Sequence, residues 1–367
     1  MNFMASFSIG TTELKKVVQQ LEPMFKGGFD NLPRILFDIN DKITASSTNG
    51  EAYSKIIFEC DISEKGKFVV PGSLFAKIVK QSNSEKIEVS TKNDNKLSVV
   101  CGKVNYEIVL LEMHEQYFEA PILEQNQNFV INSQDLKTAI NNVSCCIDIA
   151  KQHLACVMIH SNPDEKNKIY IVATDGMRLG VADKKAVFEN DIPNLMIPKK
   201  AAEYIVSMIG ETNCDLTINY NSNMIEVSNG NIFYTTKLLD TAFPKYQSVI
   251  PTQNNKILET NVSDIKDVIK SISNVSEITF RIKMVISADK IDISCEDNGN
   301  ISQASIDATY SDTKNIEIVC NFKLLTEILD KISSSIVRFQ IMDSSTPILI
   351  KPLDSDDIKY VFMPFVS

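Results

Sequence analysis

Three stretches of this sequence follow one pattern: FSIGTTELKKVV at 7–18, FVINSQDLKTAI at 129–140 and LETNVSDIKDVI at 258–269. Each begins with a short alternating run and continues with a polar residue, an acidic residue, an aliphatic residue and a lysine. A helix start is typical of this order, because the acid meets the positive end of the helix dipole. In the first stretch the apolar residues then recur at helical spacing, at Leu14, Val17, Val18 and Leu21.

The interval between the repeats indicates how the chain is divided. The aliphatic markers Leu14, Leu136 and Ile265 are 122 and 129 residues apart, which is an ordinary domain size. In a chain of 367 residues this spacing predicts three similar domains. We place them at 1–127, 128–253 and 254–367.

A second helix pattern occurs once in each unit, as VPGSLFAKIVK at 70–80, IPKKAAEYIV at 197–206 and CNFKLLTEIL at 320–329. Pro71 and Pro198 stand just before their helices, where a missing N–H costs nothing. Each unit therefore reads as two half-units, each with a strand, a helix and several further strands.

Between the helices the sequence alternates with period two, as in KIEVS at 86–90 and LTINY at 216–220. Turn signals separate these runs at Asn49-Gly50, Asp175-Gly176, Asn229-Gly230 and Asn298-Gly299. The pattern predicts an α+β fold in which each of three domains packs two helices on antiparallel sheets.

Composition limits the class of protein. Hydrophobic residues make up 44% and charged residues 23%, which is typical of a globular chain, and no apolar run has membrane-span length. The start of the sequence lacks a signal-peptide pattern, so we expect a cytoplasmic protein. The eight cysteines include no CxxC spacing, which favours reduced thiols and predicts neither a metal site nor a cofactor.

The net charge is −10, yet all six predicted helices carry lysine: Lys15, Lys16, Lys77, Lys80, Lys137, Lys199, Lys200, Lys266, Lys270, Lys323 and Lys331. If equivalent helices share one face, that face is basic and meets phosphates without reading sequence. Solvated helix surfaces are the alternative, since lysine is a common helix former.

Three motifs carry a resemblance to a known family. ATDGMRL at 173–179, KLLDTAFPKY at 237–246 followed by Val249-Ile250-Pro251, and YVFMP at 360–364 stand in one order along the chain. They resemble the DNA polymerase III beta subunit, the bacterial sliding clamp. The three-unit repeat extends this resemblance over essentially the whole chain.

The resemblance implies a non-catalytic subunit that gives the replicative polymerase its processivity. Two chains would close head to tail into a ring of six domains, with helices lining the hole around double-stranded DNA. The implied partners are a second copy, the DNA polymerase III alpha subunit, the clamp loader, and other polymerases and repair proteins. Edge strands of the first and third domains would pair between the copies, near Tyr106, Ile108 and Ile272.

The resemblance also implies a partner-peptide site between the second and third domains. Residue by residue it comprises Leu154, Thr174, Gly176, Met177, Arg178, Leu179, Pro244, Val249, Asn321, Leu324, Ser345, Val361, Met363 and Pro364. Apolar side chains would take hydrophobic anchors, while Arg178 and Asn321 would fix polar groups. The candidates that would face DNA by position are Lys26, Lys151, Gln152, His153, Lys199 and Lys200.

The sequence departs from the family pattern at its C-terminal end, Phe365-Val366-Ser367, where relatives usually end in a leucine after a basic or polar residue, and at three further positions. Met177 stands where relatives often carry a polar or aromatic residue, Leu324 where an aromatic residue is common, and Ser248 where a basic residue is common. These departures predict a somewhat different peptide preference.

Two other functions were weighed. An enzyme is disfavoured because His114, His153 and His160 form no HExxH pattern, and neither GxSxG nor a phosphate-binding glycine loop occurs. The other candidate is a repeat-built scaffold that binds peptides without encircling DNA. Dimerisation, and whether the helix lysines face one channel, would separate the scaffold from the clamp.

Overall fold

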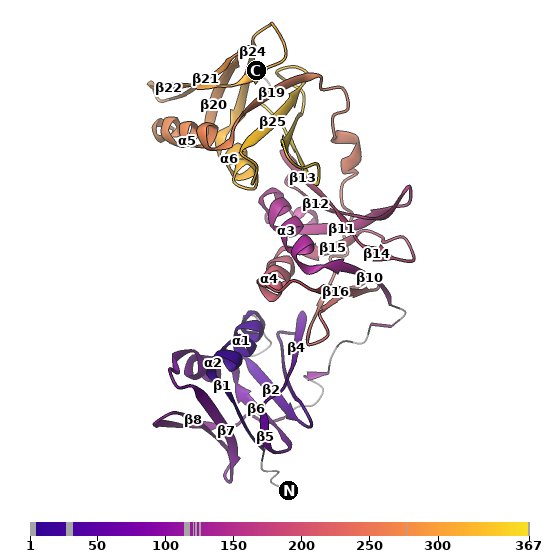
Figure 1. The fold of residues 1–367 in the computed structure, drawn as a ribbon, viewed down its shortest axis with the longest axis vertical. Helices are drawn as coiled ribbons and strands as arrows, with labels where there is room; N and C mark the ends of the chain where they lie inside the picture. Colours follow the sequence, from indigo (N-terminus) through magenta and orange to yellow (C-terminus); the bar gives the residue numbers. More distant parts are fainter. Residues whose placement is uncertain are drawn as a thin grey trace. The chain divides into compact units, whose positions relative to one another are not determined.

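The computed structural model describes residues 5–26, 32–113, 118–119, 121, 123–124, 126–276 and 278–365. Figure 1 shows the chain path. It forms two compact units, of which unit 1 comprises 1–134 with 203–238 and unit 2 comprises 135–202 with 239–367. The helices α3 (Ser133–Val143) and α4 (Lys199–Ile209) each pass from one unit into the other.

Unit 1 contains two antiparallel sheets. The first has the order β5 (Asp61–Glu64), β1 (Ser6–Gly10), β7 (Lys86–Lys92), β8 (Lys96–Cys101) and β9 (Val104–Val109). In the second, eight strands of unit 1 follow one another as β10 (Gln127–Asn132), β16 (Asp215–Tyr220), β17 (Met224–Ser228), β18 (Ile232–Lys237), β4 (Ala52–Phe58), β3 (Ile43–Thr48), β2 (Arg34–Ile39) and β6 (Gly66–Pro71).

The helices α1 (Thr11–Leu21) and α2 (Gly72–Gln81) lie side by side in unit 1, and the short helix η1 (Glu22–Phe25) follows α1. Their apolar faces are buried in one core. Phe37 is at the centre of that core, with its ring 5.2–5.9 Å from three other phenylalanine rings, those of Phe7, Phe68 and Phe75.

Unit 2 contains a nine-stranded antiparallel sheet: β15 (Leu195–Pro198), β11 (Cys156–Asn162), β12 (Glu165–Thr174), β13 (Arg178–Lys185), β27 (Ile358–Phe362), β26 (Ile348–Pro352), β25 (Ile336–Ile341), β19 (Lys256–Asn261) and β23 (Thr309–Tyr310). A second sheet has the order β22 (Asn300–Asp307), β21 (Lys290–Asp297), β20 (Arg281–Ile286) and β24 (Ile316–Asn321).

The helices α5 (Val262–Ile272) and α6 (Phe322–Leu329) belong to unit 2. Its short helices are η3 (Ser144–Cys146), η4 (Gln152–Leu154), η5 (Tyr246–Val249) and η6 (Ser273–Val275), and the two-residue strand β14 spans Val187–Phe188.

The predicted elements are confirmed. All six helices form at the repeated patterns, and the four predicted turns each close a hairpin. The second residue of each turn has a φ between 81° and 90°, which glycine adopts without strain: Gly50, Gly176, Gly230 and Gly299. The α+β class with antiparallel sheets is therefore confirmed.

Two strand pairings tie successive repeats together, and neither was predicted. β18 of the second repeat pairs with β4 of the first, and β13 of the second pairs with β27 of the third. Each pairing turns two edge strands into interior strands of one larger sheet. The pairing of β13 with β27 positions the candidate site.

The eight cysteines are free thiols, as expected. Cys60, Cys145 and Cys214 are partly exposed, and the remaining five are buried. Among the helices of the described residues, none is long and apolar enough to cross a membrane.

Candidate functional site

The hairpin between β12 and β13 holds the first part of the predicted peptide site. Asp175 accepts hydrogen bonds from the backbone N–H groups of Met177 and Arg178, each at 2.8 Å. The Thr174 hydroxyl donates to the Arg178 carbonyl at 2.8 Å and accepts from the Gly176 N–H at 3.1 Å. The ATDGMRL motif therefore builds a turn with a fixed backbone, which leaves the Met177 side chain exposed.

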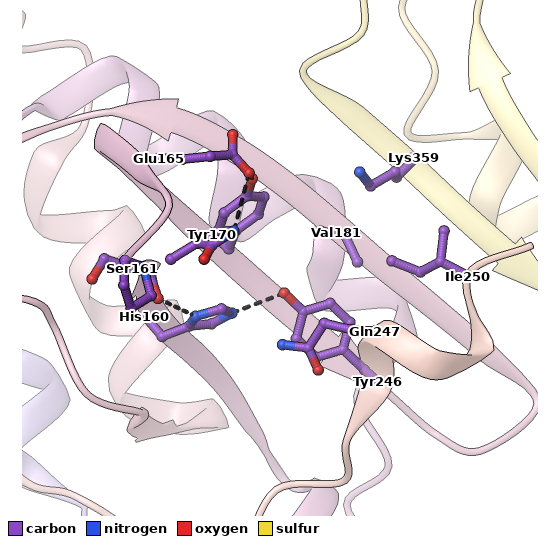
Figure 2. A pocket seen from close by; sticks show the side chains of 11 residues that line it. His160, Ser161, Glu165, Tyr170, Val181, Tyr246, Gln247, Ile250 and Lys359 are labelled. Carbon is purple, nitrogen blue, oxygen red and sulfur yellow. Dashed lines mark hydrogen bonds between the residues drawn. The ribbon is translucent and has the colours of Figure 1, made fainter. Parts of the chain in front are cut away.

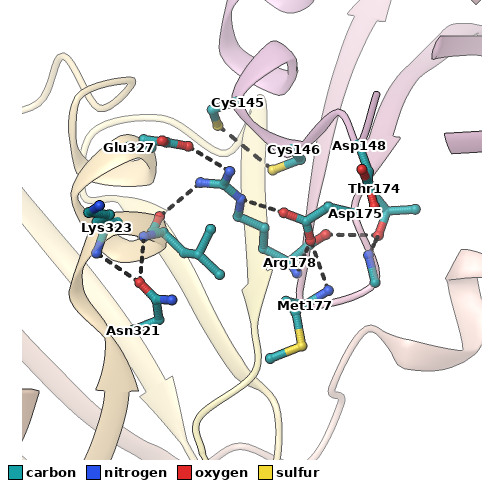
Figure 3. Close-up of polar contacts among 12 residues, drawn as sticks. Cys145, Cys146, Asp148, Thr174, Asp175, Met177, Arg178, Asn321, Lys323 and Glu327 are labelled. Carbon is teal, nitrogen blue, oxygen red and sulfur yellow. Dashed lines mark hydrogen bonds and ion pairs between the residues drawn. The ribbon is translucent and has the colours of Figure 1, made fainter. Parts of the chain in front are cut away.

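The side chain of Arg178 is only 6% exposed and connects the hairpin to α6. Its Nε donates to Asp175 Oδ2 at 2.9 Å, and one terminal nitrogen donates to the carbonyl of Leu324 at 3.0 Å. The other terminal nitrogen lies 2.6 Å from the carboxylate of Glu327. Figure 3 shows the guanidinium between Asp175 and Glu327, and each of its three nitrogens has a partner within the chain.

Asn321 caps the start of α6. Its side-chain oxygen accepts from the backbone N–H groups of Lys323 at 3.0 Å and Leu324 at 3.3 Å. The ammonium of Lys323 lies 3.5 Å from the centre of the Phe280 ring. The cap fixes the backbone of Leu324, whose carbonyl receives Arg178 (Figure 3).

The C-terminal segment lies directly against the hairpin. Leu179 is paired with Val361 in the β13–β27 ladder, and the N–H of Met363 donates to the Met177 carbonyl at 2.9 Å. Two residues further, the Phe365 N–H donates to Val319 of β24 at 2.8 Å. Residues 361–365 are therefore held by both sheets of unit 2.

We name this region the hairpin–tail surface and define it by Thr174–Leu179, Asn321–Leu324 and Val361–Pro364. Hydrogen bonds and strand register bring these three segments together. The other predicted residues lie outside these three segments: Leu154 is the buried last residue of η4, Pro244 and Val249 are exposed before η5 and at its end, and Ser345 bonds to Asp343 in its own loop.

Sequence reasoning did not single out Cys145 and Cys146. Their sulfur atoms are 3.7 Å apart, and both thiols lie beside Arg178 in Figure 3. The hydrogen bond from Cys146 lowers the pKa of the Cys145 thiol, and the Arg178 guanidinium acts in the same direction. The sequence signal that could have identified this pair is the occurrence of two consecutive cysteines upstream of the ATDGMRL motif.

A half-open cavity of about 360 Å³ lies elsewhere in unit 2, lined by His160, Tyr170, Tyr246, Gln247, Lys359 and neighbours. None of its lining residues belongs to the predicted site. The ring of His160 bonds to the Ser161 carbonyl and to the Tyr246 hydroxyl, each at 2.8 Å (Figure 2). Burial lowers the pKa of His160, because desolvation disfavours the charged imidazolium.

The other two histidines differ from His160. His153 is exposed in η4, and His114 lies outside the described residues. Within the part of the chain that the structure describes, no group of three or more histidine, cysteine, aspartate or glutamate side chains is arranged to hold a metal.

The residues predicted to face DNA occur at three places: Lys26 after η1, Lys151, Gln152 and His153 at η4, and Lys199 and Lys200 at the start of α4. Lys151 is held by neighbours, since its ammonium lies 3.2 Å from the Asp148 carboxylate and donates to the Asp175 carbonyl at 3.3 Å. It therefore supports the hairpin turn.

Several helix lysines are engaged inside their own unit: Lys15 with the Ser82 carbonyl, Lys80 with Glu22, Lys266 with Asp330 and Lys323 with Phe280. Contacts within the chain thus account for these four lysines without DNA, as the alternative of ordinary helix-surface lysines expects. Lys16, Lys77, Lys200 and Lys270 are exposed.

The residues predicted near a dimer interface lie on or behind two sheet edges. Tyr106 and Ile108 belong to β9, at the edge of its sheet, and Ile272 ends α5, where its carbonyl accepts from Ser302 of the edge strand β22. Ile108 and Ile272 are buried within the single chain, so core packing accounts for both side chains. The exposed apolar residues on these edges are Val104, Val109 and Ile301.

Curated relatives match most of the chain. The beta sliding clamp of Rickettsia bellii is 25% identical over 335 residues, covering 87% of both chains. The beta sliding clamp of Haemophilus influenzae is 24% identical over 368 residues, covering 98% of this chain and 99% of the relative.

Solved structures match the fold. A DNA polymerase III subunit beta sliding clamp from Bartonella birtlesii, bound to griselimycin, has a TM-score of 0.90 at 23% identity, covering 99% of this chain and all of that one. The DNA polymerase III beta subunit of Thermotoga maritima has a TM-score of 0.89 at 20% identity and the same coverage.

Family models cover nearly the whole sequence in three consecutive matches. The N-terminal, central and C-terminal domains of the DNA polymerase III beta subunit match residues 6–120, 130–245 and 247–366. The chain therefore belongs to the DNA polymerase III beta subunit family, the non-catalytic sliding clamps that make a DNA polymerase processive.

Proposed function

We propose that this chain closes with a second copy into a ring around duplex DNA and binds partner peptides on the hairpin–tail surface. One observation carries the peptide part of this proposal. The motifs ATDGMRL and YVFMP lie far apart in sequence, yet Leu179 and Val361 are paired on adjacent strands. A shared binding surface explains why both motifs accompany this fold.

The side chains divide by role in this proposal. Met177 and Met363 of the hairpin–tail surface offer adaptable apolar contact to the hydrophobic anchors of an extended peptide. Val249 of η5, which lies outside that surface as defined, is the further apolar residue that the resemblance assigns to the peptide site. Arg178 acts as a positioning residue, because its three nitrogens already contact Asp175, Leu324 and Glu327. Asn321 retains its amide N–H groups for a ligand, since only its oxygen serves the helix cap.

The ring would form by pairing β9 of one copy with β22 of the other. Each is the outermost strand of its sheet, with backbone groups unpaired on one side. Val109 and Ile301 would contribute apolar contact there. Replacing either with lysine should convert dimer to monomer in sedimentation analysis, whereas Val187→Lys, on another exposed strand, should leave the dimer intact.

We also propose the domain boundaries 1–127, 128–253 and 254–367, a cytoplasmic location, and contact of Lys199 and Lys200 with phosphates. Reversing both lysines to glutamate should weaken DNA association and reduce its salt slope by about 2, as expected for two lost phosphate contacts. Peptide binding should not change. Unaltered DNA association would remove the role of these lysines.

The peptide site is tested with a fluorescent peptide ending in Gln-Leu-Xaa-Leu-Phe, titrated by anisotropy. We expect a Kd of roughly micromolar, about −8 kcal/mol. Val249→Glu provides the sharp variant and Val187→Glu the matched control, because both valines are exposed, by 49% and 70%, and only Val249 is among the residues that the resemblance assigns to the peptide site.

Loss of binding in Val249→Glu, with binding retained in Val187→Glu, supports the site. Deleting residues 363–367 should also abolish binding, because it removes the tail that bonds to Met177. If the intact chain shows no binding, the partner function is refuted although the clamp fold stands. Equal effects of the two valine variants would place the peptide elsewhere.

A further inference from the structure

Two consecutive cysteines place their thiols in contact with each other beside the hairpin–tail surface. Cys145 and Cys146 occupy η3 with their sulfur atoms 3.7 Å apart, in hydrogen-bond contact (Figure 3). Cys146 is fully buried, whereas Cys145 is partly exposed. Cys145 is therefore the more accessible residue of the pair, and the Cys146 sulfur lies within contact distance of the Cys145 sulfur.

The pair is packed onto the strand that carries Arg178. Gly180 of β13 leaves room for η3, because a Cβ there would lie 3.2 Å from the backbone of Val143 and 3.4 Å from the sulfur of Cys146. This contact is two residues from Arg178. A movement of Cys146 therefore acts on β13 beside the residue that fixes α6.

The residues after η3 lead to the same surface. Asp148 pairs with Lys151, whose ammonium donates to the Asp175 carbonyl in the turn. The Asp148 N–H donates to the Leu154 carbonyl at 3.3 Å. The chain from η3 to η4 is thus connected to the hairpin from a second side.

The chemistry of Cys145 differs from that of the other thiols. The hydrogen bond from Cys146 and the charge of Arg178 favour its thiolate and lower its pKa. Burial raises the pKa of the Cys60, Cys156 and Cys320 thiols to about 11, 12 and 12. Because the thiolate is the nucleophile, Cys145 is the more reactive sulfur.

We propose that Cys145 and Cys146 form a reversible modification site that a hydroperoxide oxidises to a vicinal disulfide, altering the hairpin–tail surface. The Cys145 thiolate attacks the peroxide oxygen, giving a sulfenic acid and one water after protonation. The Cys146 sulfur then displaces the sulfenic hydroxyl as a second water, and the S–S bond forms. Overall, two thiols and one hydrogen peroxide give one disulfide and two waters.

The geometry makes this disulfide strained and readily reversed. Consecutive Cα atoms are about 3.8 Å apart, whereas disulfides usually span about 4.4–6.8 Å. The sulfur atoms must also approach from 3.7 Å to bonding distance, so the backbone of η3 has to rearrange. A strained disulfide is more easily reduced, so two equivalents of a low-molecular-weight thiol restore the pair.

The effect on partners rests on the proposed function of the hairpin–tail surface. Rearrangement of η3 disturbs the Gly180 contact and the Asp148–Lys151–Asp175 connection, which hold the hairpin. Coupling of this kind changes affinity by about two- to thirtyfold. We expect the oxidised protein to bind the peptide more weakly by a factor in that range, with recovery after reduction.

The test begins with the reduced full-length chain and an equivalent of hydrogen peroxide. Intact mass should fall by about 2 Da, the loss of two hydrogen atoms, with the change located in the tryptic peptide 138–151. Cys145→Ser and Cys146→Ser should abolish this loss, and Cys214→Ser, at a partly exposed cysteine elsewhere, should not. Phenylarsine oxide should bridge the reduced pair with release of water in the parent chain and in neither pair variant.

The peptide titration is then repeated on reduced, oxidised and re-reduced protein. Weaker binding only after oxidation, absent from both pair variants, is the expected result. Oxidation that stops at a sulfinic acid or links other cysteines overturns the modification site. A disulfide that leaves peptide affinity unchanged overturns the coupling between oxidation and peptide binding. Absence of peptide binding in the reduced protein overturns the proposed function, and the mass measurement then still tests the modification site by itself.

Discussion

Replacing Arg178 by methionine isolates the contribution of a buried guanidinium at similar side-chain length. Arg178 is 6% exposed and its partner Asp175 14%, so the change leaves a largely buried carboxylate oxygen without its donor. Glu327 is 54% exposed, and its ion pair with Arg178 is largely screened by water. The Leu324 carbonyl belongs to the first turn of α6, and a backbone donor can partly satisfy it.

The Asp175 contact therefore dominates the expected cost. A hydrogen bond to a charged group contributes about 1.5–3 kcal/mol, and removing one member of a buried pair costs about 3–5 kcal/mol. Because the Asp175 oxygen Oδ1 keeps its two backbone donors, we take about 3 kcal/mol. That value corresponds to a roughly 100-fold shift in the local opening equilibrium of α6.

Amide hydrogen exchange followed by mass spectrometry measures this opening directly. In Arg178→Met the amides of α6 should exchange roughly 100-fold faster, and those of α1 in unit 1 should not change. Glu327→Gln should accelerate α6 by about fivefold or less, and Asp175→Asn combined with Arg178→Met should be less than additive. If Glu327→Gln accelerated exchange in α6 as much as Arg178→Met does, the argument that the buried Asp175 contact outweighs the exposed Glu327 contact would be refuted. Unchanged exchange in Arg178→Met would show that the guanidinium does not hold α6.

Two further substitutions test packing and protonation. Gly180→Ala should destabilise unit 2 by about 1–3 kcal/mol, because its Cβ meets the rigid backbone of Val143, whereas Gly10→Ala meets a flexible side chain and should cost less; chemical denaturation compares them. His160 has a pKa below its ordinary 6.5, so unfolding binds a proton and stability falls as pH decreases below about 6.5. Thermal melting between pH 7.5 and 5.5 should show this loss, and His160→Gln should remove that part of the slope.

The sequence predicted elements far better than it predicted their assembly. Helix starts and hairpin turns depend on neighbouring residues, so Asp175-Gly176 was identifiable from the chain alone. The pairing of Leu179 with Val361 depends on two strands finding each other across most of unit 2. No local pattern encodes that pairing, and only the resemblance to the sliding clamps indicated that the two motifs belong together.

The same limit explains which contacts of the predicted site residues the sequence did not show. The assignment of Arg178 to peptide binding stays a prediction. The structure adds three partners within the chain, Asp175, Leu324 and Glu327, because a guanidinium buried to this degree requires partners. The assignment of Asn321 to peptide binding also stays a prediction, and the structure adds that its side-chain oxygen caps α6. Charge type was predictable from the sequence, whereas the partner depended on the tertiary fold.

These contacts explain how one surface can bind varied peptides without losing its shape. The polar groups of the hairpin–tail surface are satisfied mainly by one another, so they fix backbone positions rather than select a ligand. The side chains left exposed there, above all Met177, are flexible and apolar, and such side chains adapt to different anchors. The bonded backbone and polar groups thus keep the surface rigid, whereas the exposed apolar side chains allow different peptides to bind. A change that alters the backbone scaffold, as we propose for oxidation of Cys145 and Cys146, should weaken all partner peptides together, whereas a change at Met177 should alter their ranking.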